Sequence, residues 1–225
     1  MLKTKGFSYP TDVIVKAVFL KLRYTLSYRD IEEMLKDRGI NADHATIQRW
    51  VIKFSPYFDR KFSKKNRRGG KSWKMDEMAV KIKGEWNWYY RAVDNDGETI
   101  DFFLSKRRNA TAAKRFLIKA INRNGIPSKI NIDKSRASNA GIKRYNKQKS
   151  RRISIRFSKY MNNIIEQSHR FIQRKVKPML GFKCFKSASI TLAGFEVVRM
   201  LQKRQQKCAK NSLKTVPEMF RALAA

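Results

Sequence analysis

The sequence has few acidic residues, few cysteines and no long apolar segment. Its 225 residues hold 18 Asp and Glu against 52 Lys and Arg, a formal net charge of +34. No uninterrupted apolar run approaches the roughly 20 residues that cross a bilayer, and the first residues, MLKTKGFSYP, lack the apolar core of a signal peptide. We therefore expect a cytoplasmic protein that makes no membrane contact.

The two cysteines, Cys184 and Cys208, have neither metal-site spacing nor the pattern of a disulfide framework. This excludes a thiolate metal centre and is typical of a reduced, intracellular chain. Any metal must therefore be held by oxygen ligands, which hard divalent cations prefer.

Positive charge is what the sequence has in excess, and its isoelectric point is near 10.6. A compact particle with this charge repels itself unless a polyanion neutralises it. Nucleic acid is the obvious polyanion, because neutralising its phosphates releases counterions and supplies most non-specific affinity. A ribosome-like structural protein and a membrane-surface binder are the alternatives that charge alone leaves open.

Residues 1–57 are predicted to form a small all-helical DNA-binding domain. The segment 12–54 shows three short helical patterns, and Ser27 and Asp43 are placed to cap the second and third. A turn through Gly39 separates these two helices. Two helices joined by a short glycine-containing turn are typical of a helix-turn-helix.

The third helical pattern offers polar side chains on the face opposite its apolar stripe. In a recognition helix such side chains meet base edges and phosphates in the major groove. The candidates for DNA contact are His44, Gln48, Arg49 and Lys53. The alternative is an ordinary three-helix bundle whose polar face is solvated.

A basic segment at residues 58–71 is predicted to link this domain to a mixed α/β domain at residues 72–182. Three antiparallel strands, with turns at Gly84 and Gly97, precede helices that alternate with short strands. This order indicates a mixed sheet with flanking helices. Residues 183–225 are expected to form a C-terminal helix and a basic tail.

Three acids stand out in the mixed domain. Asp76 lies in its first strand, Asp133 directly follows the short strand KINI, and Glu166 lies on a long helix at about residues 162–177. At 100° per residue, Glu166 shares one narrow polar face of that helix with Asn162, His169 and Gln173. A polar face that is merely solvated is the alternative for this helix taken alone.

Converging carboxylates in so basic a protein suit phosphodiester chemistry. Two Mg²⁺ ions about 3.5–4 Å apart activate the attacking oxygen and stabilise the leaving one. Mg²⁺ binds through a few carboxylates together with substrate phosphates, and its charge removes the repulsion between clustered carboxylates.

Four segments carry a resemblance to a known family. KMDEMAVKIKGEW, YYRAVDNDGETIDFFLSKRRN, INIDKSRASNAGIKRYN and KYMNNIIEQSHRFIQRKVKPMLGFKCFKSA resemble, in order, the catalytic core of DDE transposases of bacterial insertion sequences. The insertion-sequence-six family is the most similar, and DHATIQRW resembles part of its helix-turn-helix. The resemblance runs from about residue 10 to 205.

This resemblance implies an RNase H-like fold, two Mg²⁺ or Mn²⁺ ions, and strand cleavage followed by transfer of a 3′-hydroxyl to target DNA. By position, Asp76, Asp133 and Glu166 match the three catalytic, metal-binding acids. Basic and polar positions of the family, expected to contact DNA phosphates or orient Glu166, fall on Lys134, Lys159, Asn162, Asn163, His169 and Arg170. The implied partners are the inverted repeats at the element's ends, target DNA and a second copy of the chain, so the nucleoid is the expected location.

The chain departs from the family pattern at several positions. Met78-Ala79 stands where Thr-Tyr is usual, Arg136 where Gly is usual, and Ser168 where an acid is common. A glycine that needed a positive φ would make Arg136 a source of strain. The competing hypothesis is a DNA-binding protein without catalysis, either a regulator or a degenerate transposase. Convergence of the three acids would argue against it.

Overall fold

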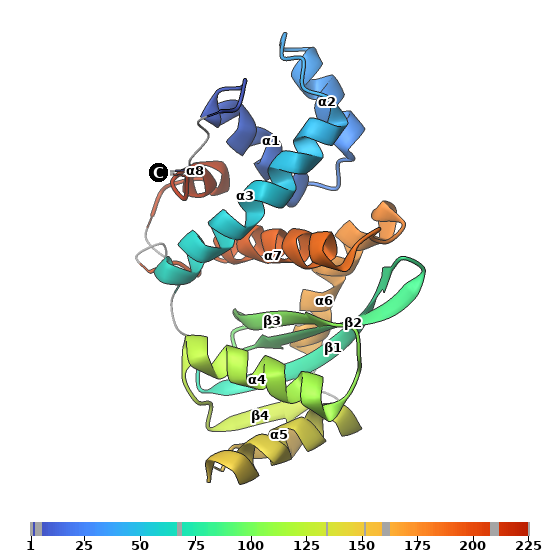
Figure 1. Ribbon diagram of the computed structural model, residues 1–225. Helices are drawn as coiled ribbons and strands as arrows, with labels where there is room; N and C mark the ends of the chain where they lie inside the picture. The colour runs from blue at the N-terminus through green and yellow to red at the C-terminus, as the bar shows by residue number, and fades with distance from the viewer. Residues whose placement is uncertain are drawn as a thin grey trace. The chain divides into compact units, whose positions relative to one another are not determined.

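A computed structural model describes residues 2, 6–66, 69–133, 135–150, 152–158, 163–207 and 212–224, except for the side chain of residue 65. The chain forms two compact units (Figure 1). One unit comprises residues 1–67 and 185–225, and the other comprises residues 68–184. Within the described residues no helix is long and apolar enough to cross a membrane.

The first unit is all-helical over its described residues. Its helices are α1 (Thr11–Arg23), α2 (Tyr28–Lys36), α3 (His44–Lys65), α7 (Phe185–Gln202) and α8 (Val216–Arg221). The predicted caps are present. Ser27 and Asp30 form a capping box at α2, and the Asp43 carboxylate accepts from the Thr46 amide at 2.7 Å at α3.

The prediction that residues 58–71 are a linker is wrong for residues 58–65, which continue α3. The physical reason is that the apolar spacing of this helix persists through the basic run. Phe58 and Phe62 are fully buried, and Phe58 packs on Phe220 of α8 with ring centroids 4.3 Å apart. Pro56 lies inside the helix and is tolerated at the cost of one backbone hydrogen bond.

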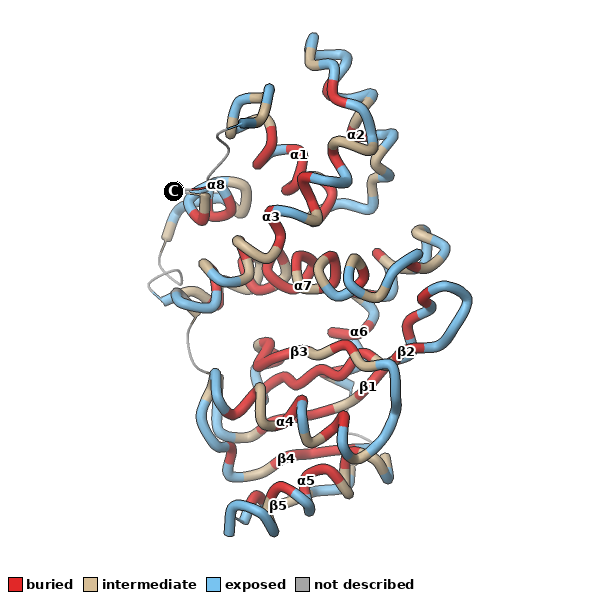
Figure 2. Tube along the Cα trace, viewed as in Figure 1, coloured by how far each residue is buried: buried red, intermediate tan, exposed pale blue. Residues whose placement is uncertain are grey.

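The C-terminal helix α7 is part of the first unit, whereas the sequence predicted a separate C-terminal segment. It packs against α1, α3 and α8 and is buried on most of its circumference, as Figure 2 shows. Gly194 permits the close approach, because a Cβ there would lie 2.6 Å from the Leu22 side chain. Such a helix is the centre of its unit rather than a surface element.

The second unit is built on a five-stranded sheet of order β3-β2-β1-β4-β5. Its strands are β1 (Ser72–Ile82), β2 (Glu85–Val93), β3 (Thr99–Ser105), β4 (Lys129–Ile132) and β5 (Ser154–Phe157). The pairs β1–β2 and β2–β3 are antiparallel, while β1–β4 and β4–β5 are parallel. The predicted turn between β1 and β2 is a two-residue loop in which Lys83 and Gly84 both have positive φ, as a type I′ turn requires.

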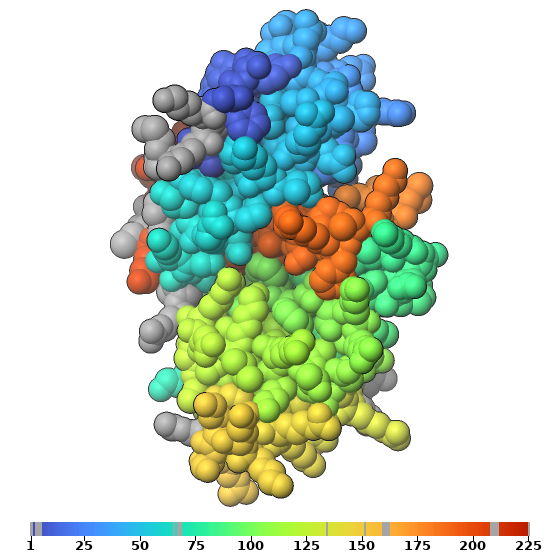
Figure 3. Space-filling view, in the orientation of Figure 1, coloured from blue at the N-terminus to red at the C-terminus, as the bar shows by residue number. Residues whose placement is uncertain are grey.

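Helices flank this sheet. They are α4 (Ala110–Asn124), α5 (Arg136–Lys149), α6 (Asn163–Val176) and a short 3₁₀ turn (Lys177–Met179). The apolar residues of α4 and α5 form one core with Trp73 and Met75 of β1. Figure 3 shows the outer surface of α4 (yellow-green) and α5 (gold) in this unit. Helix α6 packs against β1 and β2. This is the mixed sheet with flanking helices that the resemblance implied.

Asp101, an acid of β3, is buried. The carboxylate of Asp101 pairs with Lys119 Nζ at 2.7 Å and Arg123 at 3.3 Å, both on α4. The pairing compensates the loss of water around the carboxylate and fixes α4 on β3.

Candidate active site

The parallel pair of β1 and β4 brings two of the predicted acids to neighbouring positions. The register pairs Met75 with Ile132, and Asp76 and Asp133 are the next residues on the two strands. Asp76 and Asp133 are therefore brought to neighbouring positions by the parallel pairing of β1 and β4.

The alternation of β1 separates two kinds of side chain. Trp73, Met75 and Glu77 point into the core with α4 and α5, and Ser72, Lys74 and Asp76 lie on the other face. Helix α6 covers part of that second face. Asp76 therefore lies between the sheet and α6, on the polar side of the sheet.

Helix α6 carries the third predicted acid and the histidine next to it. The buried residues of this helix include Ile165, His169 and Ile172, which follow one another at helical spacing, whereas Glu166 is exposed. His169 Nδ1 lies 3.5 Å from Asp76 Oδ2. The predicted common face of Glu166 and His169 is thus divided, and it is the histidine that is turned onto the sheet.

The electrostatic environment of Asp76 is unusual for a carboxylate. Burial raises its pKa to about 7, and the charges of Glu77, Asp133 and Glu166 add to the rise against one opposing backbone hydrogen bond. Desolvation and like charges both disfavour the ionised form. The site is therefore one in which a cation would be strongly favoured beside Asp76.

His169 is neutral in this environment. Burial lowers its pKa to about 3, and the nearby charge of Arg91 lowers it further. The ring is only 5% exposed, and its Nε2 has no hydrogen-bond partner among the described residues. The sequence predicted that His169 contacts a phosphate or orients Glu166. A buried neutral ring that contacts Asp76 does not fit a phosphate contact.

The three acids have the ligand chemistry that a hard divalent cation prefers, but their positions do not yet form a complete ion-binding site. Asp76, Asp133 and Glu166 supply oxygen ligands, as Mg²⁺ and Mn²⁺ prefer. Among the described residues, however, no three Asp, Glu, His or Cys side chains lie close enough together to hold one ion. Because the charges of Asp133 and Glu166 raise the pKa of Asp76, the three carboxylates lie near one another. Binding of one ion by all three would require the carboxylates to move closer together.

Glu77, adjacent to Asp76 in sequence, differs from it in that its carboxylate is surrounded by hydrogen-bond donors. Its side chain is fully buried and accepts hydrogen bonds from Ser135 Oγ at 2.7 Å and Ser138 Oγ at 3.0 Å. Arg108 Nε donates to the same carboxylate at 2.9 Å. Ser135 is also the N-cap of α5. Glu77 therefore fixes the start of α5, two residues after Asp133, to the centre of the sheet.

The departures from the family pattern fit the fold without strain. Arg136 is the first residue of α5, and it is not among the residues with positive φ. The strain considered for a replaced glycine is therefore absent. Met78 is buried in β1, and Ser168 is buried on the inner face of α6, where its small size suits the packing.

The remaining predicted DNA contacts have varied positions. Gln48, Arg49 and Lys53 are exposed on α3, and Asn163 and Arg170 are exposed on α6. His44 is exposed but engaged, since both its backbone amide and Nδ1 contact Glu32 of α2 at about 3 Å (3.0 and 2.9 Å). Lys134, Lys159 and Asn162 lie outside the described residues.

Sequence reasoning missed the partners of Glu77 and two polar residues, Lys74 and Asn131, beside the acids. Lys74 and Asn131 precede Asp76 and Asp133 by two residues each, so they share the acids' sheet face. Polar residues at every second position of two otherwise buried strands were the available signal. The donors to Glu77 could not be found in this way, because they come from the β3–α4 loop and from the start of α5, far from Glu77 in sequence.

Comparisons with known proteins agree with this arrangement. A family described as a DDE domain matches residues 70–205, more than half of the chain. The chain is 37% identical over 198 residues to the transposase for insertion sequence-like element IS431mec of Staphylococcus aureus, covering 87% of each chain. It has the same identity and coverage to the transposase for insertion sequence element IS257 in transposon Tn4003, also of Staphylococcus aureus.

Solved structures with a partial likeness are retroviral. The HTLV-2 integrase catalytic core domain in complex with magnesium is 17% identical, with a TM-score of 0.47 over 67% of this chain and 96% of that one. The catalytic core domain of BIV integrase is also 17% identical, with a TM-score of 0.46 over 68% of this chain and 95% of that one.

The family match spans both strands that carry the neighbouring acids and the helix that carries Glu166. The relatives extend the agreement to most of the chain. The chain therefore belongs to the DDE transposases of insertion sequences, enzymes that cleave DNA strands and transfer them to a target.

Proposed function

We propose that Asp76, Asp133 and Glu166 are the catalytic acids of this transposase and that they hold two divalent ions, Mg²⁺ or Mn²⁺. The observation that carries the proposal is the environment of Asp76. It lies beside Asp133 at the end of a parallel strand pair, and the charges of Asp133 and Glu166 raise its pKa. Carboxylates that repel one another on a basic protein are best explained by a cation that binds between them.

When bound, such ions would activate the attacking oxygen and stabilise the leaving oxygen of a phosphodiester. The chain's own residues would position the acids that hold these ions. Strands β1 and β4 hold Asp76 and Asp133 side by side, while the neutral ring of His169 contacts Asp76 and presents no competing charge. Glu77 and its donors anchor the α5 end of the loop that contains Asp133. Glu166, exposed on α6, has the freedom to complete the set.

The helical unit is proposed to read the ends of the element. Gln48, Arg49 and Lys53 are exposed on α3, and the capped start of this helix is tied to α2 by the His44–Glu32 contact. Polar and basic side chains on the exposed face of a second helix are what major-groove recognition uses. His44 then acts mainly by fixing the two helices, with its exposed edge near DNA.

The proposed partners are the inverted repeats of the element, target DNA and at least one further copy of the chain. Strand transfer must hold two DNA ends together, so a homodimer or larger assembly on DNA is expected, located at the nucleoid. A net charge of +34 agrees with an assembly that contains several DNA segments.

The test is strand transfer in vitro with DNA that carries the element's ends and a target plasmid, in Mg²⁺, Mn²⁺ or EDTA. We expect joined product that depends on the metal and disappears in Asp133→Asn. The matched control is Asp96→Asn, an exposed acid in the β2–β3 turn. Binding of the ends without cleavage in either metal would contradict the proposal and identify the chain as a degenerate, DNA-binding transposase.

A further inference from the structure

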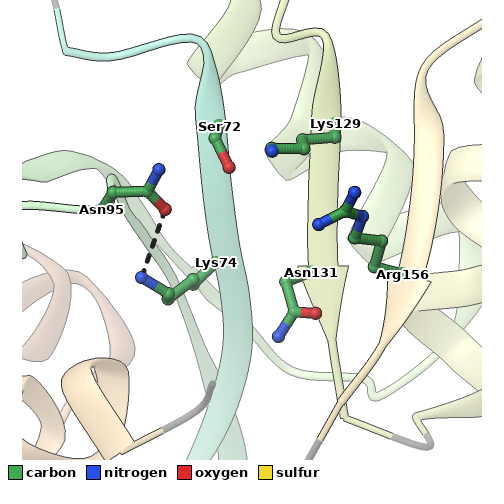
Figure 4. A pocket seen from close by; sticks show the side chains of 6 residues that line it. All are labelled: Ser72, Lys74, Asn95, Lys129, Asn131 and Arg156. Atoms are coloured by element: carbon green, nitrogen blue, oxygen red, sulfur yellow. Dashed lines mark hydrogen bonds between the residues drawn. The ribbon is translucent and has the colours of Figure 1, made fainter.

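A hollow of about 70 Å³ opens on the polar face of the sheet, at the beginning of β1 and β4. Its lining is polar throughout and comes from three strands and the β2–β3 turn. The lining residues are Ser72, Lys74, Asn95, Lys129, Asn131 and Arg156 (Figure 4). Its three charged residues are all cations.

The strand register places this hollow in line with the acids. Lys74 of β1 pairs with Asn131 of β4, and Asn131 pairs with Arg156 of β5, so the three form one row across the sheet. Asp76 and Asp133 are each two residues further along the same strands, on the same face. Two residues of a strand span about 6.6 Å, close to the direct separation of neighbouring phosphates along one DNA strand.

In the part of the chain that the structure describes, the cations of the hollow have no acidic partner. Among the described residues, no ion pair includes Lys74, Lys129 or Arg156. Lys74 is buried and has the amide oxygen of Asn95 as a hydrogen-bond acceptor at 3.3 Å. Burying an ammonium group against a neutral partner is costly unless an anion also reaches it.

On the core face of the same unit, cations do have acidic partners. There Lys119, Arg123 and Arg108 each pair with a buried carboxylate. On that face a buried carboxylate faces each of these three cations. In the hollow, side chains from three adjacent strands converge with only amides and a hydroxyl between them (Figure 4).

We propose that this hollow is a phosphodiester-binding subsite, which holds a phosphate of the DNA strand one or two nucleotides from the phosphate at the acids. The inference rests on the proposed function, since the acids define where the strand is cut. Lys129 and Arg156 contact the phosphate oxygens, and Lys74 with Asn131 forms the floor. The subsite would fix the register of the strand, because it holds a second phosphate at a set distance from the cleaved one.

The variants Lys129→Gln and Arg156→Gln test the subsite without disturbing the core, since Lys129 is half-buried and Arg156 is exposed. Lys147→Gln, an exposed position on α5, is the control that removes the same charge elsewhere in the unit. All three are made in the full chain with Asp133→Asn, so that DNA binding is measured with no cleavage. Each lost contact should lower the slope of log affinity against log salt by about 0.9 on duplex DNA.

A single neutral methylphosphonate is then placed at successive positions of the DNA, first in the element-end strand and then in the target strand. At one position, one or two nucleotides from the cut or joining site, the neutral group should weaken binding of the Lys147→Gln chain about tenfold. At that position it should leave Lys129→Gln and Arg156→Gln nearly unchanged, because their contact is already lost. The strand that responds identifies the source of the phosphate.

If every position weakens the two subsite variants and the control alike, in both strands, the subsite is refuted. Strand transfer by the otherwise unaltered chain is measured in parallel. Joined product together with uniform methylphosphonate effects would overturn the subsite while the proposed catalysis stands. A position-specific effect without joined product would support the subsite while the catalytic proposal fails.

Discussion

Asp76 and Glu77 are neighbours on one strand, yet the fold treats their carboxylates in opposite ways. Glu77 points into the α4–α5 side and accepts from three donors, Arg108, Ser135 and Ser138. Asp76 points to the other side, where its named partner is a neutral histidine at 3.5 Å and its electrostatic neighbours are acids. A buried carboxylate that the protein supplies with hydrogen-bond donors and a counter-charge has a structural role. A carboxylate that is surrounded by other acids is arranged to bind a cation.

The largest effect that this comparison predicts is on catalysis. Asp76→Asn keeps the shape of the side chain and removes a metal ligand, so strand transfer should fall by about 10³-fold or more. Glu77→Asp, which keeps the charge, should retain more activity than Asp76→Asn. The check is the initial rate of joined product in Mg²⁺, and comparable activity of Asp76→Asn and the unaltered chain would remove Asp76 from the catalytic set.

The next effect concerns stability against pH in EDTA. The pKa of Asp76 is raised to about 7 in the folded chain, so the folded state binds the proton more tightly than the unfolded one. The ionised carboxylate therefore costs stability progressively between about pH 4 and pH 7, by an amount of order 2–4 kcal/mol. Asp76→Asn should be more stable than the unaltered chain at pH 8 and similar at pH 4. Urea unfolding at both pH values measures this, and a pH-independent difference would contradict it.

Glu77→Gln should show the reverse sign. The amide is a weaker acceptor and leaves Arg108 without its buried counter-charge, so the free energy of unfolding should fall by about 1–3 kcal/mol at pH 8. Thermal and urea unfolding in EDTA provide the measurement. A stabilising Glu77→Gln would mean that the two neighbouring acids do not differ in the way described.

A smaller effect is expected at Ser138, whose hydroxyl donates to Glu77 at 3.0 Å. Ser138→Ala removes one of three donors and should cost about 1 kcal/mol in the free energy of unfolding. In a double-mutant cycle with Glu77→Gln the two losses should be less than additive, because they share a contact. Strict additivity would place Ser138 outside the Glu77 network.

Much of the fold follows from local sequence signals. Ser27 and Asp43 cap the helices they were expected to cap, and Lys83-Gly84 forms the turn that the glycine indicated. The family resemblance pointed to Asp76 and Asp133 as catalytic acids, and a parallel strand pair places them at neighbouring positions. Each of these features depends on a few residues close in sequence or on a known strand order.

Features that depend on distant partners could not be predicted. The basic residues of segment 58–71 concealed Phe58 and Phe62, whose burial depends on α8 and extends α3 to Lys65. His169 is turned inward because Ile165 and Ile172, not Ile164 and Phe171, lie on the stripe that packs on the sheet. Which of two apolar stripes is buried is set by the surface that receives the helix.

Metal binding to the free chain tests most directly whether Asp76, and not Glu77, is arranged for a cation. Mn²⁺ is titrated into the unaltered chain, Asp76→Asn and Glu77→Gln, and the melting temperature is followed at pH 8. We predict that Mn²⁺ raises the melting temperature of the unaltered chain and of Glu77→Gln, because an ion that binds only the folded state stabilises it, and leaves Asp76→Asn unchanged. An equal rise in Asp76→Asn, or a rise that disappears only in Glu77→Gln, would contradict this account of the two acids.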